Sequence, residues 1–186
     1  MSCKVKVLKW LYILIGEISK HYSPHFGYFI LVFFMLNSSI PYHNVGIGQI
    51  GFSIPQSYVD INELAEARGI ISEKLTKGLG LKKMAVCVEQ ETIDVLIANA
   101  LEDLWCNSAD EGETLNSFLK NVDRIYLGTE SAIDGAKPTA TYGLDTLSKR
   151  FDFDYSHIDV VDLTFACIGA VDALHNCIDY VRLNPD

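Results

Sequence analysis

The chain has 186 residues, of which 49% are hydrophobic and 21% are charged, and its net charge at pH 7 is −9. This composition supports one globular domain with a sizeable core and excludes a disordered chain. Residues 43–186 hold 11 Lys and Arg against 23 Asp and Glu, whereas residues 1–42 hold 4 against 1. The acidic body argues against a nucleic-acid surface, because phosphates are bound by a basic stripe.

Residues 1–42 differ from the rest of the chain. Two apolar runs, 8–15 and 27–36, are each shorter than the roughly 20 residues needed to cross a bilayer, so we expect no membrane span. A basic start before a short apolar run imitates a secretory signal, but no small-residue cleavage site follows. We expect a cytoplasmic protein in which this leader lies outside the fold, with Met35 as a candidate native start.

The body, residues 43–186, alternates strand-like and helix-like segments. Asp60 and Glu63 resemble a capping box that opens one helix, and Gly69 is suited to end it. Strands are predicted at 45–53, 83–88, 122–129 and 158–165, and helices at 60–68, 91–105, 114–120, 138–150 and 168–182. This order predicts an α/β fold with a mixed or parallel sheet and crossover helices.

Cys167 lies between the last predicted strand and the last predicted helix. Free N–H groups and the positive end of the helix dipole favour a thiolate at such a place, and the thiolate is the form that attacks a thioester. The same cysteine, among apolar neighbours, also fits a small core residue. A second segment favours the nucleophile.

That second segment is 122–134, where a strand-like run ends in Gly128, Thr129 and Glu130. In open α/β sheets ligands collect at the carboxyl ends of strands, so Glu130 and Cys167 could face one pocket, although Glu130 also fits a solvated loop. A thiolate that holds an acyl group and a carboxylate that moves a proton at the adjacent carbon indicate carbon–carbon bond chemistry.

From residue 45 to about 181 the chain resembles the hydroxymethylglutaryl-CoA synthases of the thiolase superfamily, over their amino-terminal half. The segments that carry the resemblance are VGIGQIGF (45–52), YVD (58–60), ELAEARG (63–69), GLG (78–80), KMAV (83–86), GTESAID (128–134) and ACIGA (166–170). The resemblance implies the first βαβαβ-type repeat of a thiolase-like fold, incomplete at its carboxyl end.

The resemblance also implies roles for individual residues. Cys167 would be acetylated by acetyl-CoA, Glu130 would be the general acid/base, and Lys74 would contact CoA, although any surface lysine would match as well. The implied reaction condenses acetyl-CoA with acetoacetyl-CoA and water to 3-hydroxy-3-methylglutaryl-CoA, a step of the mevalonate pathway to isoprenoids. Both thioesters are substrates, so no cofactor is expected. Lysines 74, 77, 82 and 83 form the only basic cluster of the body, or a solvated charge run.

The chain departs from the family's pattern in two ways. Ile168 and Phe165 replace an aromatic and a polar residue that many members carry around the nucleophile, so the pocket wall would differ. The family's catalytic histidine comes from its second half, and we expect neither His157 nor His175 to replace it. His175 would lie about 12 Å along a helix from Cys167, and His157 precedes the strand, at its opposite end.

The sequence is compatible with three functions of the chain. The chain is the amino-terminal half of such a synthase, active only with its missing carboxyl-terminal half or a complementing chain; or it is another condensing enzyme of the ketoacyl synthase type; or it is a non-catalytic fragment. Family members are commonly homodimers, so self-association is expected.

The five cysteines, at positions 3, 87, 106, 167 and 177, include no C-x-x-C pair and no zinc-ligand spacing. The pattern is typical of a reducing compartment rather than of a disulfide framework, and we expect no metal site.

Overall fold

The computed structural model describes residues 10–15, 30–37, 45–110, 112–165 and 168–184. A mixed five-stranded sheet has the order β3-β2-β1-β6-β7, in which β1, β6 and β7 run parallel and β2 is antiparallel to both β1 and β3. The strands span Trp10–Ile15 (β1), Ile30–Asn37 (β2), Val45–Ser53 (β3), Arg124–Thr129 (β6) and Asp159–Leu163 (β7). A separate antiparallel pair joins β4 (Ser57–Asp60) to β5 (Lys83–Val86).

The sheet differs from the expectation that residues 1–42 lie outside the fold. Strand β1 lies between β2 and β6, and its Leu11 pairs with Ile125, while β2 pairs with β3. The physical reason is that an apolar run too short to cross a bilayer can still form a strand inside a sheet, where its backbone groups are paired by neighbouring strands. The rest of that segment lies outside the described residues.

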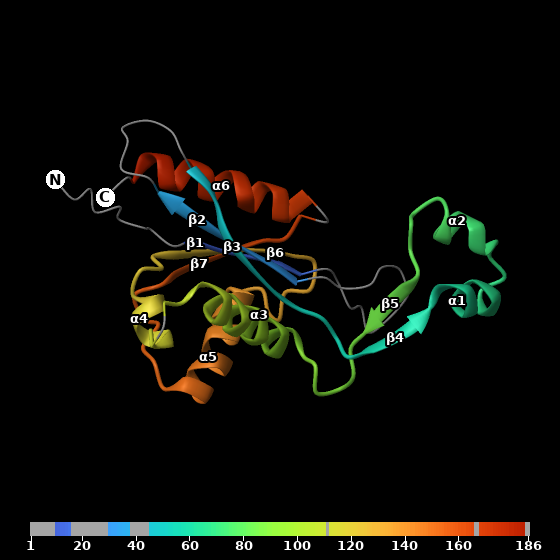
Figure 1. Cartoon of the computed structure of the whole chain (residues 1–186), viewed down its shortest axis with the longest axis horizontal. Coiled ribbons are helices and arrows are strands. Elements are labelled where there is room, and N and C mark those ends of the chain that lie inside the picture. The colour runs from blue at the N-terminus through green and yellow to red at the C-terminus, as the bar shows by residue number, and fades with distance from the viewer. Residues whose placement is uncertain (1–9, 16–29, 38–44, 111, 166–167, 185–186) are drawn as a thin grey trace.

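Helices cover the two faces of the sheet unequally. Helices α3 (Ile93–Ser108), α4 (Leu115–Leu119) and α5 (Thr139–Phe151) lie on one face, and α6 (Gly169–Leu183) lies on the other (Figure 1). Helices α1 (Ile61–Ala67) and α2 (Ser72–Thr76) stand with β4 and β5 away from this body (Figure 1). The fold of the body is therefore helix, sheet and helix in three layers.

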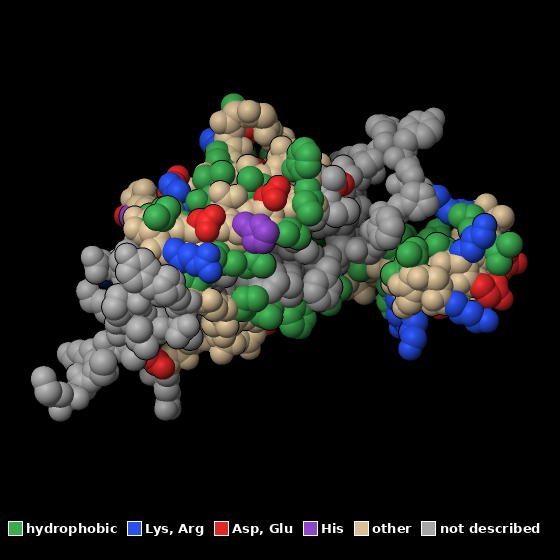
Figure 2. Space-filling view, turned by 90° about the horizontal axis from the view of Figure 1, so that it is seen from above, with side chains coloured by type: hydrophobic (Ala, Val, Ile, Leu, Met, Phe, Trp, Pro, Cys, Tyr) green, Lys and Arg blue, Asp and Glu red, His purple; other side chains and the backbone are tan. Residues whose placement is uncertain are grey.

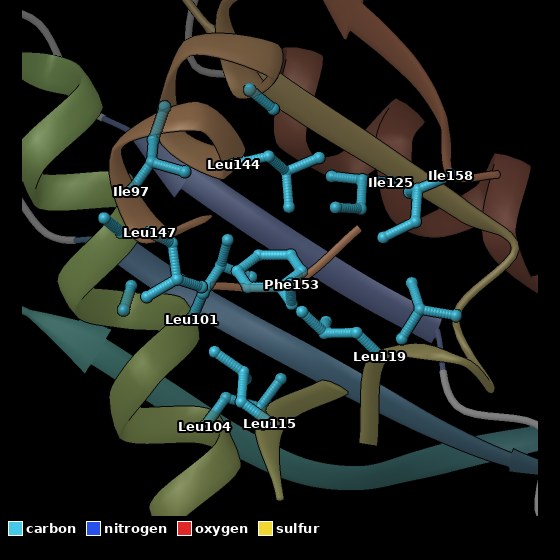
Figure 3. Packing of buried hydrophobic residues seen from close by; sticks show 14 of the residues in the cluster. Ile97, Leu101, Leu104, Leu115, Leu119, Ile125, Leu144, Leu147, Phe153 and Ile158 are labelled. Atoms are coloured by element: carbon cyan, nitrogen blue, oxygen red, sulfur yellow. The ribbon is translucent and has the colours of Figure 1, made fainter. Parts of the chain in front are cut away.

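Strand β6 is buried on both faces. Ile125 and Leu127 belong to the cluster with α3, α4 and α5, and the intervening Tyr126 packs with Ala173 and Cys177 of α6. Figure 3 shows the first cluster, in which Leu101, Leu144 and Phe153 come from separate segments and converge under the sheet. This two-sided burial explains why the inner residues of β6, 125–128, form a continuous run without a charged side chain.

Helix α6 leaves apolar surface uncovered. Exposed hydrophobic residues on it or just before it are Phe165, Ile168, Val171 and Leu183. Figure 2 shows hydrophobic side chains mixed with charged ones on the face that carries this helix. Three helices on one side and a single, partly apolar helix on the other leave the sheet asymmetrically covered.

The strands and helices expected between residues 45 and 182 are confirmed, with ends that differ by a few residues. Asp60 caps α1 through its carboxylate, which accepts a hydrogen bond from the Asn62 backbone at 2.8 Å, and Gly69, with a φ of 64°, follows its end. Strand β4 and helix α2 were not expected from the sequence. In the part of the chain that the structure describes, no helix combines the length and apolarity needed to traverse a bilayer.

Candidate active site

The carboxyl ends of β6 and β7 meet at one edge of the sheet. The two strands are parallel, and Gly128 pairs with Leu163. Glu130 follows β6 directly and is exposed, while Thr164 and Phe165 follow β7 and are exposed too. Two chain segments that are more than 30 residues apart in sequence therefore end side by side.

Glycines let helix α6 approach this edge closely. A methyl group built on Gly128 would lie 2.5 Å from Ala170 Cα and 2.8 Å from the Gly169 carbonyl carbon, and one built on Gly169 would lie 2.5 Å from Leu163 O. A side chain at either position would push the helix from the strands. The start of α6 is thus packed backbone to backbone against the end of β6.

Cys167 lies outside the described residues. In the chain it comes four residues after the end of β7 and two before the first residue of α6. The predicted strand and helix on either side of it are confirmed, whereas its own position and its distance from Glu130 remain predictions.

Thr129 fixes the backbone on either side of Glu130. The Thr129 side chain is buried at 1% exposure, and its hydroxyl oxygen accepts a hydrogen bond from Ser131 N at 2.9 Å. Glu130 is the middle residue of this turn, between the donor Ser131 and the acceptor Thr129. The carboxylate-bearing residue therefore leaves a rigid strand through a fixed turn.

Asp162 of β7 anchors the next part of the loop. Its Oδ2 accepts a hydrogen bond from Thr139 N at 2.7 Å, at the first residue of α5, where Pro138 provides no side-chain cap. The buried Thr139 hydroxyl in turn accepts a hydrogen bond from Ile133 N at 3.2 Å. A carboxylate at a helix N-terminus is favoured by the unpaired N–H groups and by the helix dipole.

Asp134 holds the outer part of the same loop. Its Oδ1 accepts hydrogen bonds from Ala136 N at 2.7 Å and Lys137 N at 2.6 Å, and Tyr142 of α5 donates its hydroxyl to Oδ2. The Tyr142 hydroxyl and these backbone donors keep the pKa of Asp134 below its ordinary value. The 130–138 loop is therefore tied to β6, β7 and α5 at separate points.

Lys74 lies far from this edge along the chain. It is exposed in the last turn of α2, and its neighbours Lys77, Lys82 and Lys83 are exposed as well. Lys83 Nζ lies 3.7 Å over the ring of Tyr58, so part of the basic cluster packs on an aromatic side chain. Figure 2 shows Lys and Arg side chains around this projecting part of the molecule, on the right.

The two histidines among the described residues, His157 and His175, lie away from Glu130. His157 Nε2 is 3.1 Å from Leu119 O, before β7 begins, and so lies at the amino end of the parallel strands. His175 is exposed in α6, six residues after its start. In the described residues no group of three or more His, Cys, Asp or Glu side chains is arranged to hold a metal ion.

Comparison with known proteins decides the family. The family model described as "Hydroxymethylglutaryl-coenzyme A synthase N terminal" matches residues 41–185. The chain belongs to the hydroxymethylglutaryl-CoA synthase family. Hydroxymethylglutaryl-CoA synthase A of Dictyostelium discoideum is 32% identical over 139 residues, which cover 75% of this chain and 27% of that protein. The synthase of Enterococcus faecalis is 30% identical, with 76% and 33% covered.

Solved structures agree with this assignment. A hydroxymethylglutaryl-CoA synthase complexed with CoA superimposes with a TM-score of 0.58 at 27% identity, covering 75% of this chain and 32% of that one. A β-ketoacyl-acyl carrier protein synthase III from Thermus thermophilus has a TM-score of 0.55 at 23% identity and shows the fold alone. The expected thiolase-like α/β fold is confirmed, and the chain spans about a third or less of the length of the synthases that it matches.

Asp162, Thr129 and Thr139 were not predicted as site residues. The available signal for Asp162 was a charged residue inside a strand, between the apolar residues Val161 and Leu163. Thr129 gave no signal, because threonine is common in strands, and Thr139 gave none, because the bond from the Ile133 amide to its hydroxyl cannot be read from the sequence.

Proposed function

We propose that this protein is the amino-terminal, nucleophile-bearing part of a hydroxymethylglutaryl-CoA synthase. The observation that carries the proposal is the packing of Gly128 against Gly169 and Ala170, because it sets the strand end that precedes Glu130 beside the helix that follows Cys167. The family match over residues 41–185 supports the assignment of the GTE and AC motifs to that edge.

The reaction proceeds in three balanced steps. The Cys167 thiolate attacks the acetyl carbonyl of acetyl-CoA, and the CoA thiol leaves with a proton. Glu130 removes a proton from the acetyl methyl group, the enolate carbon forms a bond to the ketone carbon of acetoacetyl-CoA, and the ketone oxygen takes the proton back from Glu130 and becomes a hydroxyl. Water then cleaves the Cys167 thioester and releases 3-hydroxy-3-methylglutaryl-CoA, the precursor proposed for isoprenoid synthesis. Free N–H groups at the start of α6 would stabilise the oxyanions.

The chain acts together with a second half. The uncovered apolar residues of α6 and the absence of a histidine near Glu130 among the described residues support a complementing segment or chain. A homodimer of complete subunits in the cytoplasm is the proposed setting, with CoA thioesters as ligands and Lys74 as a CoA contact. Alone, the 186 residues should give little or no turnover.

Radiolabelled acetyl-CoA tests the nucleophile. The chain should take up label on Cys167, Cys167→Ala should take up none, and Cys106→Ala, which removes an exposed thiol elsewhere in the chain, should match the wild type. A folded chain without label supports a non-catalytic fragment, and label on Cys167→Ala contradicts the assignment.

Acetoacetyl-CoA tests the acid/base. In the complemented enzyme Glu130→Ala should still be acetylated but should form no product. Steady production of 3-hydroxy-3-methylglutaryl-CoA by the purified chain alone would show that no second half is required.

A further inference from the structure

Residues 57–86 form a projecting arm. The β4-β5 ribbon leads away from the body to α1 and α2 (Figure 1). Its buried side chains, Ile61 and Ala65, lie within α1, and neither hydrophobic cluster of the body includes a residue of the arm. Among the described residues, apolar packing therefore does little to fix the arm on the body, and polar contacts at its base carry more weight.

Both legs of the arm are held by one carboxylate. Glu91 Oε1 accepts a hydrogen bond from Gln56 N at 2.9 Å, just before β4, and Glu91 Oε2 accepts one from Val88 N at 3.0 Å, just after β5. The ladder of the ribbon begins immediately beyond, where Ser57 pairs with Val86. Glu91 thus joins two points that are 32 residues apart at the place where strand pairing stops.

Glu91 is itself attached to the core of the body. It lies two residues before α3, and its own N–H donates a hydrogen bond to Val88 O at 3.0 Å. The buried side of α3 includes Leu96, Ile97 and Leu101 in the main cluster. A movement of the arm therefore requires breaking bonds to a residue that the core helix holds in place.

A carboxylate is suited to this place for a chemical reason. An ionised glutamate is an acceptor at both oxygens, so it satisfies two N–H donors at once, and such charge-assisted bonds are stronger than neutral ones. A glutamine offers one oxygen and would turn an NH₂ group toward the second donor.

We infer that Glu91 is the clasp that fixes the arm on the body and thereby sets the place of Lys74. The second clause rests on the proposed function, in which Lys74 contacts CoA. Lys74 is exposed in α2, beyond the ribbon, so a change of angle at the base moves its ammonium further than it moves the base itself. Glu91 is a positioning residue, since it acts through the arm and not on the substrate.

Hydrogen exchange tests the clasp on the whole chain. In Glu91→Gln at least one of the amides of Gln56 and Val88 should exchange about fivefold faster or more, the equivalent of one lost hydrogen bond, while α3 amides keep their protection. Glu89→Gln is the matched control, because Glu89 is exposed two residues away and the charge change is the same. Unchanged exchange at both amides in Glu91→Gln overturns the clasp.

A second variant covers the case in which Glu91→Gln also loosens α3. Glu91→Asp keeps the charge but shortens the side chain by one methylene group, so it reaches only one of the two amides. Faster exchange at Gln56 or Val88 with α3 unchanged supports the clasp, and wild-type exchange at both amides overturns it.

CoA affinity, measured by calorimetry with CoA alone as the probe, tests the positioning role. Glu91→Gln should weaken binding roughly three- to tenfold, as expected for a displaced charge contact, and should have no further effect in a Lys74→Ala background. If Lys74→Ala weakens binding and Glu91→Gln does not, the positioning role is overturned. If Lys74→Ala has no effect, or the wild type binds no CoA, the proposed contact between Lys74 and CoA is wrong. The hydrogen-exchange results then decide by themselves whether Glu91 fixes the arm on the body.

Discussion

Gly128 and Gly169 lie so close that a methyl group on Gly169 would be 3.8 Å from Gly128 Cα, although the two residues are 41 positions apart. A methyl group on Gly128 would meet the Ala170 backbone at 2.5 Å. The contact joins the end of β6 to the start of α6 without side chains. It sets the strand end that precedes Glu130 against the first residues of α6.

Gly128→Ala should destabilise the protein by about 1–3 kcal/mol, because the added carbon has no space against a helix backbone. The free energy of unfolding in urea measures the effect. Gly135→Ala is the control, since a methyl group there would meet nothing within 4 Å. Equal stability of the two variants would argue against the close packing of α6 on β6.

Asp162→Ala should lower the free energy of unfolding by about 1–2 kcal/mol, the usual effect of removing a helix cap. The lost bond is the one to Thr139 N, and exchange of the Ile133 amide should quicken as α5 loosens. Asp123→Ala removes an equal charge from an exposed position and should change neither quantity. If the Ile133 amide keeps its protection in Asp162→Ala, the 130–138 loop does not depend on the Asp162 carboxylate.

Thr129→Val should release the turn around Glu130. The Ser131 amide loses its acceptor, so its exchange should rise roughly fivefold, equivalent to about 1 kcal/mol. Thr129→Ser keeps the hydroxyl and should retain most of the protection. If the serine and valine variants exchange alike, the hydroxyl is not what holds the turn.

The Asp94–Thr146 contact between α3 and α5 should make the free energy of unfolding depend on pH. Burial alone would raise the pKa of Asp94, but hydrogen bonds from Thr92 and Thr146 outweigh it and lower the pKa below 3.8. A lowered carboxyl pKa stabilises the fold above the unfolded value and loses that effect as pH falls through the folded one. Thr146→Val should therefore lower the free energy of unfolding by about 1–2 kcal/mol at pH 7. The difference in this free energy between the variant and the wild type should become smaller below about pH 4. A difference that stays constant to pH 2 in urea titrations would contradict this account.

Cys87 should resist alkylation. Burial, with a smaller contribution from Glu91, raises the pKa of its thiol to about 11, so the reactive thiolate is scarce at pH 8. Peptide mapping after iodoacetamide treatment should show Cys106, which is exposed, modified well before Cys87. In urea the two should react at similar rates, and rapid native labelling of Cys87 would indicate an open arm base.

The order of elements in the body was readable from local pattern. The apolar spacing of α3 identifies a helix, because a helix buried on one face repeats its apolar residues every three or four positions. The apolar run at 125–128 in β6 identifies a buried strand, because a strand buried on both faces has apolar residues at successive positions. Strand β4 and helix α2, with four and five residues, are too short to leave such a period. The strand role of 10–15 was missed for a different reason: its partner β6 begins more than 100 residues later, so no local pattern shows the pairing.

The residues proposed to carry the chemistry can be read from the sequence: a cysteine before a helix, a glutamate after a strand, and the motifs that identify the family. The groups that support these residues become visible only in the folded chain. Asp162 accepts a hydrogen bond from a residue 23 positions away, and Glu91 accepts one from a residue 35 positions away. Neither separation corresponds to a helix or strand period, so no sequence pattern predicts these bonds. Local preferences are written in neighbouring residues, whereas a hydrogen bond between distant segments exists only after the sheet and the core have brought them together.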